Sequence, residues 1–211
     1  MAACDSLWTS FQGANPINCV VTQGICPEGQ VCNAQTRLCV GGPTVLSLVA
    51  GALGGAGSAD DTGAAARFYY PSGVAVDGAG SLYVADNYNH TIRKVVLSTG
   101  AVTTLAGSAG QAGSDDGTGA AARFYYPSGV AADGAGSLYV ADSGNDTIRK
   151  VVLSTGAVTT LAGSAVQRGS ADGIGAAARF DYPRGMTADG AGGGRWRRLP
   201  LRRRVRKQHD S

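Results

Sequence analysis

The chain has 211 residues, 33 of them glycine, with 16% charged and 7% aromatic side chains and a formal net charge of +3. The glycine content, together with a mean hydropathy near zero, is typical of short strands and turns and argues against a disordered chain. No run of about 18 apolar residues occurs, so no transmembrane helix is expected.

The charge is unevenly distributed. Residues 1–194 hold 10 Lys and Arg against 14 Asp and Glu, a net charge of −4, whereas residues 195–211 hold 8 against 1, a net charge of +7. Since the larger part is mildly acidic, a broad nucleic-acid-binding surface is not expected there.

The first 42 residues are predicted to form a small cysteine-rich module. Cys19, Cys26, Cys32 and Cys39 fall within 21 residues that also contain glycine and proline turns. This spacing predicts a module held by disulfides, with three pairings open, which requires an oxidising compartment. A zinc site is the alternative, but the segment has no histidine and no CxxC pair. The stretch CPEGQVCNAQTRLCV resembles small cysteine-rich segments of secreted bacterial proteins.

Cys4 stands apart from these four cysteines. The opening MAACDS resembles the end of a bacterial lipobox, which implies lipidation of Cys4 and anchoring to a membrane. The basic and apolar regions of a signal peptide are missing, which a start site placed too far downstream would explain. The alternative is a free or intermolecular thiol.

A 56-residue repeat follows. Residues 67–122 and 123–178 differ at only eight positions, and the same register continues before and after them. Such a period indicates a solenoid, a propeller or an array. In the first copy we predict four strands, at 73–77, 81–86, 91–97 and 101–107, joined in two pairs by glycine-containing hairpins. Four antiparallel strands per repeat favour a propeller blade over a β-helix.

The string DGTGAAARFYYPSGVAADGAGSLYVADSGNDTIRKV (116–151) strongly resembles the NHL repeat of bacterial surface proteins. The resemblance covers residues 44–190. It implies a β-propeller, usually of six blades, that binds proteins, RNA or cell-envelope ligands. A few related propellers are enzymes that hold a metal with histidines or carboxylates.

We therefore expect an all-β fold, a partial and open β-propeller within residues 43–190. Its two blades should span about 67–107 and 123–163, with a lone strand at 44–50 and another at 185–189. Open blade edges predict self-association. The arginine-rich segment 191–211 breaks the repeat and is expected to be disordered. It is interpreted as the product of a frameshift, with a solvated tail or a nucleic-acid or membrane-binding arm as alternatives.

No catalytic or metal-binding residue is predicted. His90 is replaced by Asp146 in the next repeat, and His209 lies in the aberrant tail, so no histidine set recurs. Asp77 and Asp86 recur and are expected to cap turns. The acidic-glycine loops offer oxygens for calcium but lack the spacing of a calcium loop, so no cofactor is expected.

The positions that differ between repeats indicate a binding face. Most of them fall in two loops that emerge on one side of the blades, whereas the hairpin turns of the other side are identical. Tyr88 is the only aromatic residue among these loop positions, and Tyr69, Tyr70 and Tyr83, which recur, are interpreted as packing residues. The candidate binding residues are Asn87, Tyr88, His90, Ser143, Asp146 and Arg168.

Two functions follow from these patterns. The first is a non-catalytic binding module at the cell envelope or outside the cell, which contacts a protein or a glycan through this face. The alternative is a fragment of a propeller lyase or hydrolase whose catalytic residues lie in further blades.

Overall fold

The computed structural model describes residues 30–32, 39–41, 47–52 and 54–188. The chain divides into two compact units, Met1–Ser47 and Leu48–Ser211. In the first unit, β1 (Gln30–Cys32) and β2 (Cys39–Gly41) pair antiparallel, with Cys32 opposite Cys39. The candidate residues Cys4, Cys19 and Cys26, and the segment 191–211, lie outside the described residues.

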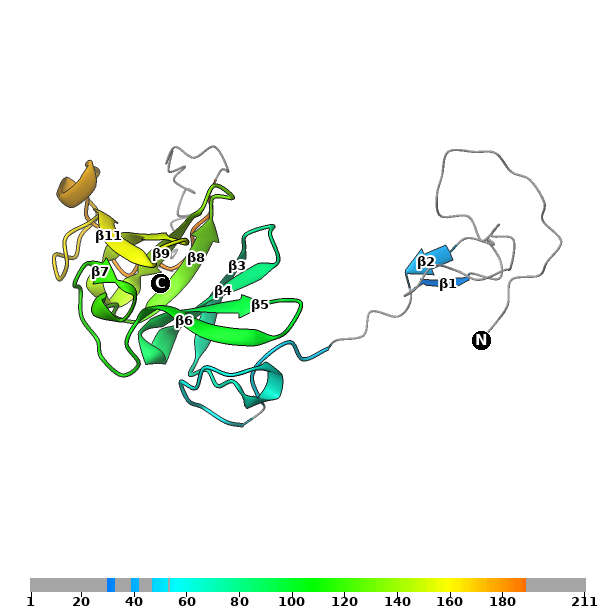
Figure 1. Cartoon of the computed structure of the whole chain (residues 1–211). Helices are drawn as coiled ribbons and strands as arrows, with labels where there is room; N and C mark the ends of the chain where they lie inside the picture. Colours follow the sequence, from blue (N-terminus) through cyan, green and yellow to red (C-terminus); the bar gives the residue numbers. More distant parts are fainter. Residues whose placement is uncertain (1–29, 33–38, 42–46, 53, 189–211) are drawn as a thin grey trace, which may run out of the picture. The chain divides into compact units, whose positions relative to one another are not determined.

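The first blade of the second unit is a four-stranded antiparallel sheet in the order β3-β4-β5-β6 (Figure 1). Its strands are β3 (Pro71–Val76), β4 (Ser81–Asp86), β5 (Thr91–Val96) and β6 (Ala101–Gly107). These bounds confirm the predicted strands to within two residues. The Asp77 carboxylate accepts hydrogen bonds from the amides of Ala79 and Ser81, at 2.8 and 3.0 Å, and so fixes the β3–β4 turn as predicted.

The second blade repeats this sheet with one addition. Its strands are β8 (Pro127–Ala132), β9 (Ser137–Asp142), β10 (Thr147–Val152) and β11 (Ala157–Ala162). A short strand, β7 (Gly117–Thr118), pairs with the outer edge of β11 and makes the sheet five-stranded. The connection that leaves the first blade therefore covers the outermost strand of the second.

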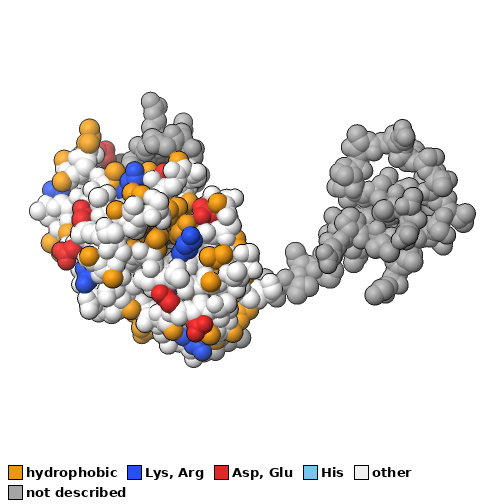
Figure 2. All heavy atoms as spheres, viewed as in Figure 1, with side chains coloured by type: hydrophobic (Ala, Val, Ile, Leu, Met, Phe, Trp, Pro, Cys, Tyr) orange, Lys and Arg blue, Asp and Glu red, His pale blue; other side chains and the backbone are white. Residues whose placement is uncertain are grey.

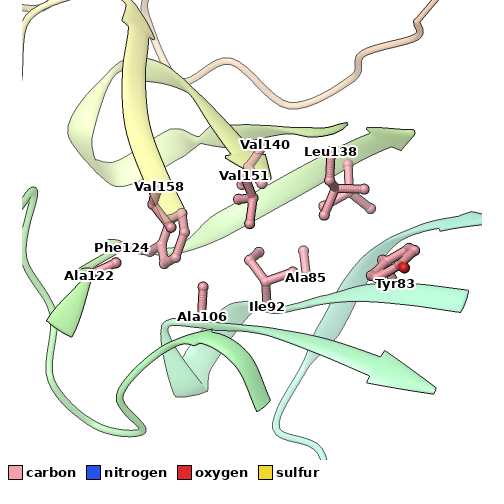
Figure 3. Packing of buried hydrophobic residues seen from close by; sticks show 11 residues of the cluster. Tyr83, Ala85, Ile92, Ala106, Ala122, Phe124, Leu138, Val140, Val151 and Val158 are labelled. Carbon is pink, nitrogen blue, oxygen red and sulfur yellow. The ribbon is translucent and has the colours of Figure 1, made fainter. Parts of the chain in front are cut away.

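The main core lies between the two blades (Figure 3). Side chains of the first blade face those of the second, and Phe124, Leu138, Val140 and Ile92 are completely or almost completely buried. Burial of apolar side chains between the sheets is the main favourable contribution to this packing. The members of this cluster are Tyr83, Ala85, Ile92, Ala106, Ala122, Phe124, Val130, Leu138, Val140, Val151 and Val158.

The innermost strands of the two blades approach each other closely. A Cβ atom on Gly73 of β3 would collide with the carbonyl oxygen of Ser128 in β8. The Ser72 hydroxyl donates a 3.0 Å hydrogen bond to that same oxygen, 56 residues further along the chain. Glycine and serine in the Pro-Ser-Gly stretch are thus what lets one repeat pack on the next.

An arginine that sequence reasoning did not single out is central to each blade. Arg93 is fully buried and donates to the carboxylates of Asp86, also fully buried, at 2.8 Å, and of Asp60 at 2.6 Å. Arg149 repeats both contacts, with Asp142 at 2.9 Å and Asp116 at 2.8 Å. Buried charges need such partners, so this network explains why the Asp and Arg of YVAD and TIRK occur together in each repeat.

Burial raises the pKa of the buried aspartate of this network in both blades. It raises the pKa of Asp142 to about 6, against hydrogen bonds from Asn145, from the Tyr125 amide and from Arg149. The pKa of Asp86 is raised for the same reason. Asp86 also accepts a hydrogen bond from the Tyr69 amide at 2.7 Å, which confirms its predicted capping role.

Lone strands were predicted at 44–50 and 185–189. Their described parts, 47–50 and 185–188, form no strand, because neither has a hairpin partner among the described residues. Residues 183–184 still lie against β8, where the Ser128 hydroxyl donates to the carbonyl of Pro183 at 3.2 Å.

None of the described helices is long and apolar enough to cross a membrane.

Candidate binding surface

The two consecutive tyrosines of each RFYYP stretch have an unusual backbone. Tyr70, Tyr126 and, in the third partial repeat, Tyr182 have positive φ angles of 53°, 50° and 45°. Non-glycine residues rarely take this conformation, which is a strained one for a bulky side chain. In the second and third repeats this conformation is held by hydrogen bonds from the amides of Tyr126 and Tyr182 to side chains of the preceding repeat. Such strain recurring at an exposed position points to a functional surface.

These residues form a continuous aromatic surface together with a residue of the neighbouring loop. We define the tyrosine surface as Tyr69, Tyr70, Tyr88, Tyr125 and Tyr126. The ring of Tyr88 lies 5.1, 4.8 and 5.3 Å from the rings of Tyr69, Tyr70 and Tyr126, and the rings of Tyr125 and Tyr126 are 4.6 Å apart. The surface therefore crosses the joint between the two blades.

The rings of this surface remain accessible to solvent. Tyr70 is 69% exposed and Tyr88 44% exposed, whereas Tyr83 is 2% exposed. The interpretation of the recurring tyrosines as packing residues is therefore confirmed for Tyr83 and its counterpart Tyr139, but it is wrong for Tyr70. Tyr126 has nearly the same φ but is only partly exposed, because His90 and Tyr88 of the preceding repeat pack against its ring.

Four of the predicted binding residues make hydrogen bonds between repeats. His90 Nδ1 accepts a 3.2 Å hydrogen bond from the amide of Tyr126, and Asp146 Oδ1 accepts one of 2.8 Å from the amide of Tyr182. Asn87 donates to the carbonyl of Pro127 at 2.8 Å, and the Ser143 hydroxyl donates to the carbonyl of Pro183. We call these contacts the repeat joint.

The repeat joint changes how the variable positions are understood. His90, Ser143 and Asp146 are buried, and each replacement between repeats keeps the hydrogen-bonding role of the residue it replaces. Sequence reasoning took this variation as a sign of ligand contact. The sequence alone does not show that a histidine and an aspartate at this position both accept the equivalent amide proton.

His90 is held in its neutral form. Its Nδ1 atom must be unprotonated to accept the bond from Tyr126, and its ring packs edge-on against the ring of Tyr126 at 4.8 Å. Burial lowers the pKa of His90, although the interaction of its side chain with the backbone of Asn87 opposes this.

Tyr88 and Gly144 occupy the same position in the two repeats but not the same surroundings. The ring of Tyr125 covers Gly144, and a Cβ atom there would lie 2.6 Å from the Tyr125 carbonyl oxygen. In the first repeat Tyr88 fills the equivalent place and keeps its ring on the surface. The absence of a side chain at 144 thus results from crowding.

Arg168, the last predicted binding residue, is half exposed. Its guanidinium carbon lies 4.0 Å from the centre of the Tyr182 ring, and its Nε atom lies 3.4 Å from Asp146 and 3.1 Å from Asp181. Together, Tyr88 and Arg168 are the two predicted binding residues with substantial exposed side chains.

The described residues contain no group of three or more His, Cys, Asp or Glu side chains placed to hold a metal ion. In the acidic-glycine loops, the carboxylates of Asp60 and Asp116 pair with the buried arginines. Charged side chains are few and scattered over the face seen in Figure 2. The face seen in Figure 2 is therefore mainly neutral.

Comparison with known proteins identifies the repeat. The family model described as "NHL repeat" matches residues 68–95 and 124–151, one segment in each blade. The chain contains two NHL repeats. Each matched segment contains the buried Asp–Arg pair, so the NHL signature of this chain corresponds to the network that holds its strands and loops together.

Curated relatives contain the same repeat within much longer chains. The protein SUPPRESSOR OF QUENCHING 1, chloroplastic, of Arabidopsis thaliana is 40% identical over 100 residues, which is 47% of this chain and 9% of that protein. NHL repeat-containing protein 2 of Bos taurus is 40% identical over 109 residues, again 47% of this chain and 15% of the relative. The NHL chain thus spans a small part of the length of each.

Solved structures match a similar share of this chain. A structural genomics protein of unknown function from Bacteroides thetaiotaomicron is 30% identical, with a TM-score of 0.49 over 54% of this chain and 28% of that one. An auxiliary nutrient binding protein from Bacteroides ovatus is 27% identical, with a TM-score of 0.44 over 50% of this chain and 29% of that one.

Proposed function

We propose that this NHL chain is a non-catalytic binding module that contacts a protein or a glycan through the tyrosine surface. The observation that carries the proposal is the row of exposed tyrosine rings across the repeat joint. Tyrosine gives a large, amphipathic contact area and loses little side-chain entropy on binding, and for this reason it is enriched at binding hot spots.

The rigidity of the surface supports the same function. The backbone at Tyr69 and Tyr125 is fixed by hydrogen bonds to Asp86 and Asp142, which are themselves anchored by the buried arginines. A surface that is ordered before binding loses less conformational entropy when the partner arrives. The cysteine-rich segment 1–42, which suits an oxidising compartment, supports a location at the cell envelope or outside the cell.

The proposal is tested with peptide and glycan arrays probed with the full chain and two variants. Tyr70→Gly removes the most exposed ring at a position whose φ of 53° suits glycine, so folding should be retained. Leu97→Ala removes an exposed side chain from the opposite, hairpin side of the same blade.

We expect ligands of the wild-type chain to bind Tyr70→Gly about 5- to 30-fold more weakly, the usual effect of removing an interface anchor, and to bind Leu97→Ala unchanged. Ligands that respond only to Leu97→Ala would place the binding site on the other side of the blades and refute the proposal.

A further inference from the structure

The third partial repeat contains an internal example of what a tyrosine of this surface can bind. Tyr182 corresponds to Tyr70 and Tyr126 of the two complete repeats, and the guanidinium of Arg168 lies 4.0 Å from the centre of its ring. Two carboxylates, from Asp146 and Asp181, complete the contacts of this arginine. A guanidinium over an aromatic face is a favourable cation–π pair.

The loop that carries Arg168 has the same backbone arrangement in all three repeats. Gly57, Gly113 and Gly169 each donate their amide to the carbonyl of the phenylalanine that precedes the tyrosine pair, at 3.1, 3.1 and 2.9 Å. The residue just before each of these glycines is therefore placed alike. It is Arg168 in the third case but Ala56 and Ala112 in the first two, and both alanines are exposed.

The complete repeats thus have the tyrosine without the arginine. Tyr70 is 69% exposed, and the residue that corresponds to Arg168 in its repeat is the small Ala56. Residues 1–194 also carry a net charge of −4, which favours the approach of a cationic partner.

From this internal example we infer that the tyrosine surface binds an arginine side chain of a partner chain, with the exposed ring of Tyr70 accepting a guanidinium as Tyr182 accepts that of Arg168. The inference rests on the proposed function and specifies its partner as an arginine-bearing protein segment. Arginine is favoured over lysine, because its planar guanidinium can stack on the face of a ring.

The inference is tested by fluorescence anisotropy with the full chain and a labelled glycine–serine peptide that carries two arginines. Two matched peptides carry lysine or neutral citrulline at the same positions. We expect the citrulline peptide to bind at least about tenfold more weakly and the lysine peptide to fall between the two. Equal binding of the arginine and citrulline peptides would overturn the inference, while loss of binding in Tyr70→Gly would still uphold the tyrosine surface.

Two variants reproduce or remove the internal arginine. Ala56→Arg places an arginine at the position relative to Tyr70 that Arg168 has relative to Tyr182, and it is expected to reduce peptide binding at least about tenfold. Arg168→Ala exposes the Tyr182 ring and should add a binding site. Unchanged binding in both variants would contradict the inference.

The chain's own arginines are the other source of guanidinium groups. If residues 195–206 occupied the surface, a chain that ends at residue 190 would bind the peptide more tightly than the full chain does. We expect the same affinity for both, and a gain of more than about threefold would assign the surface to the chain's own arginines instead of a partner's.

Discussion

His90 and Asp146 show how a single position can change residue type and keep its physical role. Each residue has a left-handed backbone, with φ of 57° and 55°, and each accepts the amide proton of the second tyrosine in the following repeat. The two acceptors differ in how they respond to acid. A carboxyl group keeps an acceptor oxygen in either protonation state, but an imidazole loses its Nδ1 acceptor when it is protonated.

We therefore predict that the His90→Asp variant resists mild acid better than the wild-type chain. The pKa of His90 is lowered in the folded chain, so its contribution to stability is complete above the unfolded value of about 6.5 and is lost as the pH falls through the folded value. Thermal unfolding of both proteins between pH 7.5 and 5 tests this.

The buried aspartates act in the opposite sense on pH dependence. Because the folded pKa of Asp142 is raised to about 6, its contribution decreases as the pH rises from about 4 towards 6. This effect is present in both proteins and cancels in their difference. Parallel melting curves for wild type and His90→Asp would show that His90 does not accept the Tyr126 amide in its neutral form.

Gly144 allows a second prediction for a single residue. Since the ring and the carbonyl of Tyr125 cover it, Gly144→Ala should shift Tyr125 and destabilise the chain by about 1–3 kcal/mol, as overpacking commonly does. Tyr88→Ala, at the same position of the first repeat, serves as the comparison and should cost about 0.5–1.5 kcal/mol through lost ring contacts. Urea denaturation measures both, and a Gly144→Ala variant as stable as wild type would contradict the crowding at this position.

The strands of each blade were predictable from the sequence, but the arginine buried in each blade was not. The β-branched residues and glycine hairpins predicted the four strands of a blade, because the backbone needs of short strands are local. The buried arginine was not predicted, since charged side chains are rarely buried and the pattern TIRKV does not show which way Arg93 points. The signal that could have found it is the recurrence of an aspartate seven residues before an arginine, Asp86 with Arg93 and Asp142 with Arg149.

The candidate site was predictable only in part. Sequence comparison of the repeats named Tyr88 and Arg168, whose side chains are exposed. It missed Tyr70 because identical residues in two repeats suggested packing. The exposure of this ring depends on the packing of a neighbouring repeat, which covers Tyr126 but not Tyr70.

The buried network leads to a prediction for the strand β10. Arg149→Ala leaves the carboxylate of Asp142 buried without its charged partner and should reduce the free energy of unfolding by about 3–5 kcal/mol. Its neighbour Lys150 is only partly buried, so Lys150→Ala should change stability by no more than about 0.5 kcal/mol. Similar losses for the two variants in chemical denaturation would rule out the network as the main support of the strand.

In the NHL unit as a whole, the two blades are covered to different extents. Val130 in β8 is 6% exposed because the first blade packs on it, but its counterpart Val74 in β3 is 64% exposed and Val76 is 60% exposed. An apolar strand surface of this kind is a site of association. The prediction of self-association through open blade edges therefore applies to the β3 side.

We predict that Val74→Lys reduces self-association without loss of stability, because a charge on an exposed strand discourages pairing with another chain. Val130→Lys is the matched control and should unfold the chain, since the same change there buries an unpaired charge. Sedimentation velocity over a range of concentrations gives the result. A wild-type chain that stays monomeric at all concentrations would contradict the prediction that it self-associates through the β3 side.

The central claim, that the tyrosine surface is the binding face of the NHL unit, is tested most directly by NMR of the tyrosine rings. All eight tyrosines of the chain lie within the described residues, and they divide into surface and core groups. On titration with the arginine peptide, we predict that ring signals of Tyr70, Tyr88 and Tyr126 shift while those of the buried Tyr83 and Tyr139 stay in place. Shifts confined to the buried rings, or none at all, would contradict the claim.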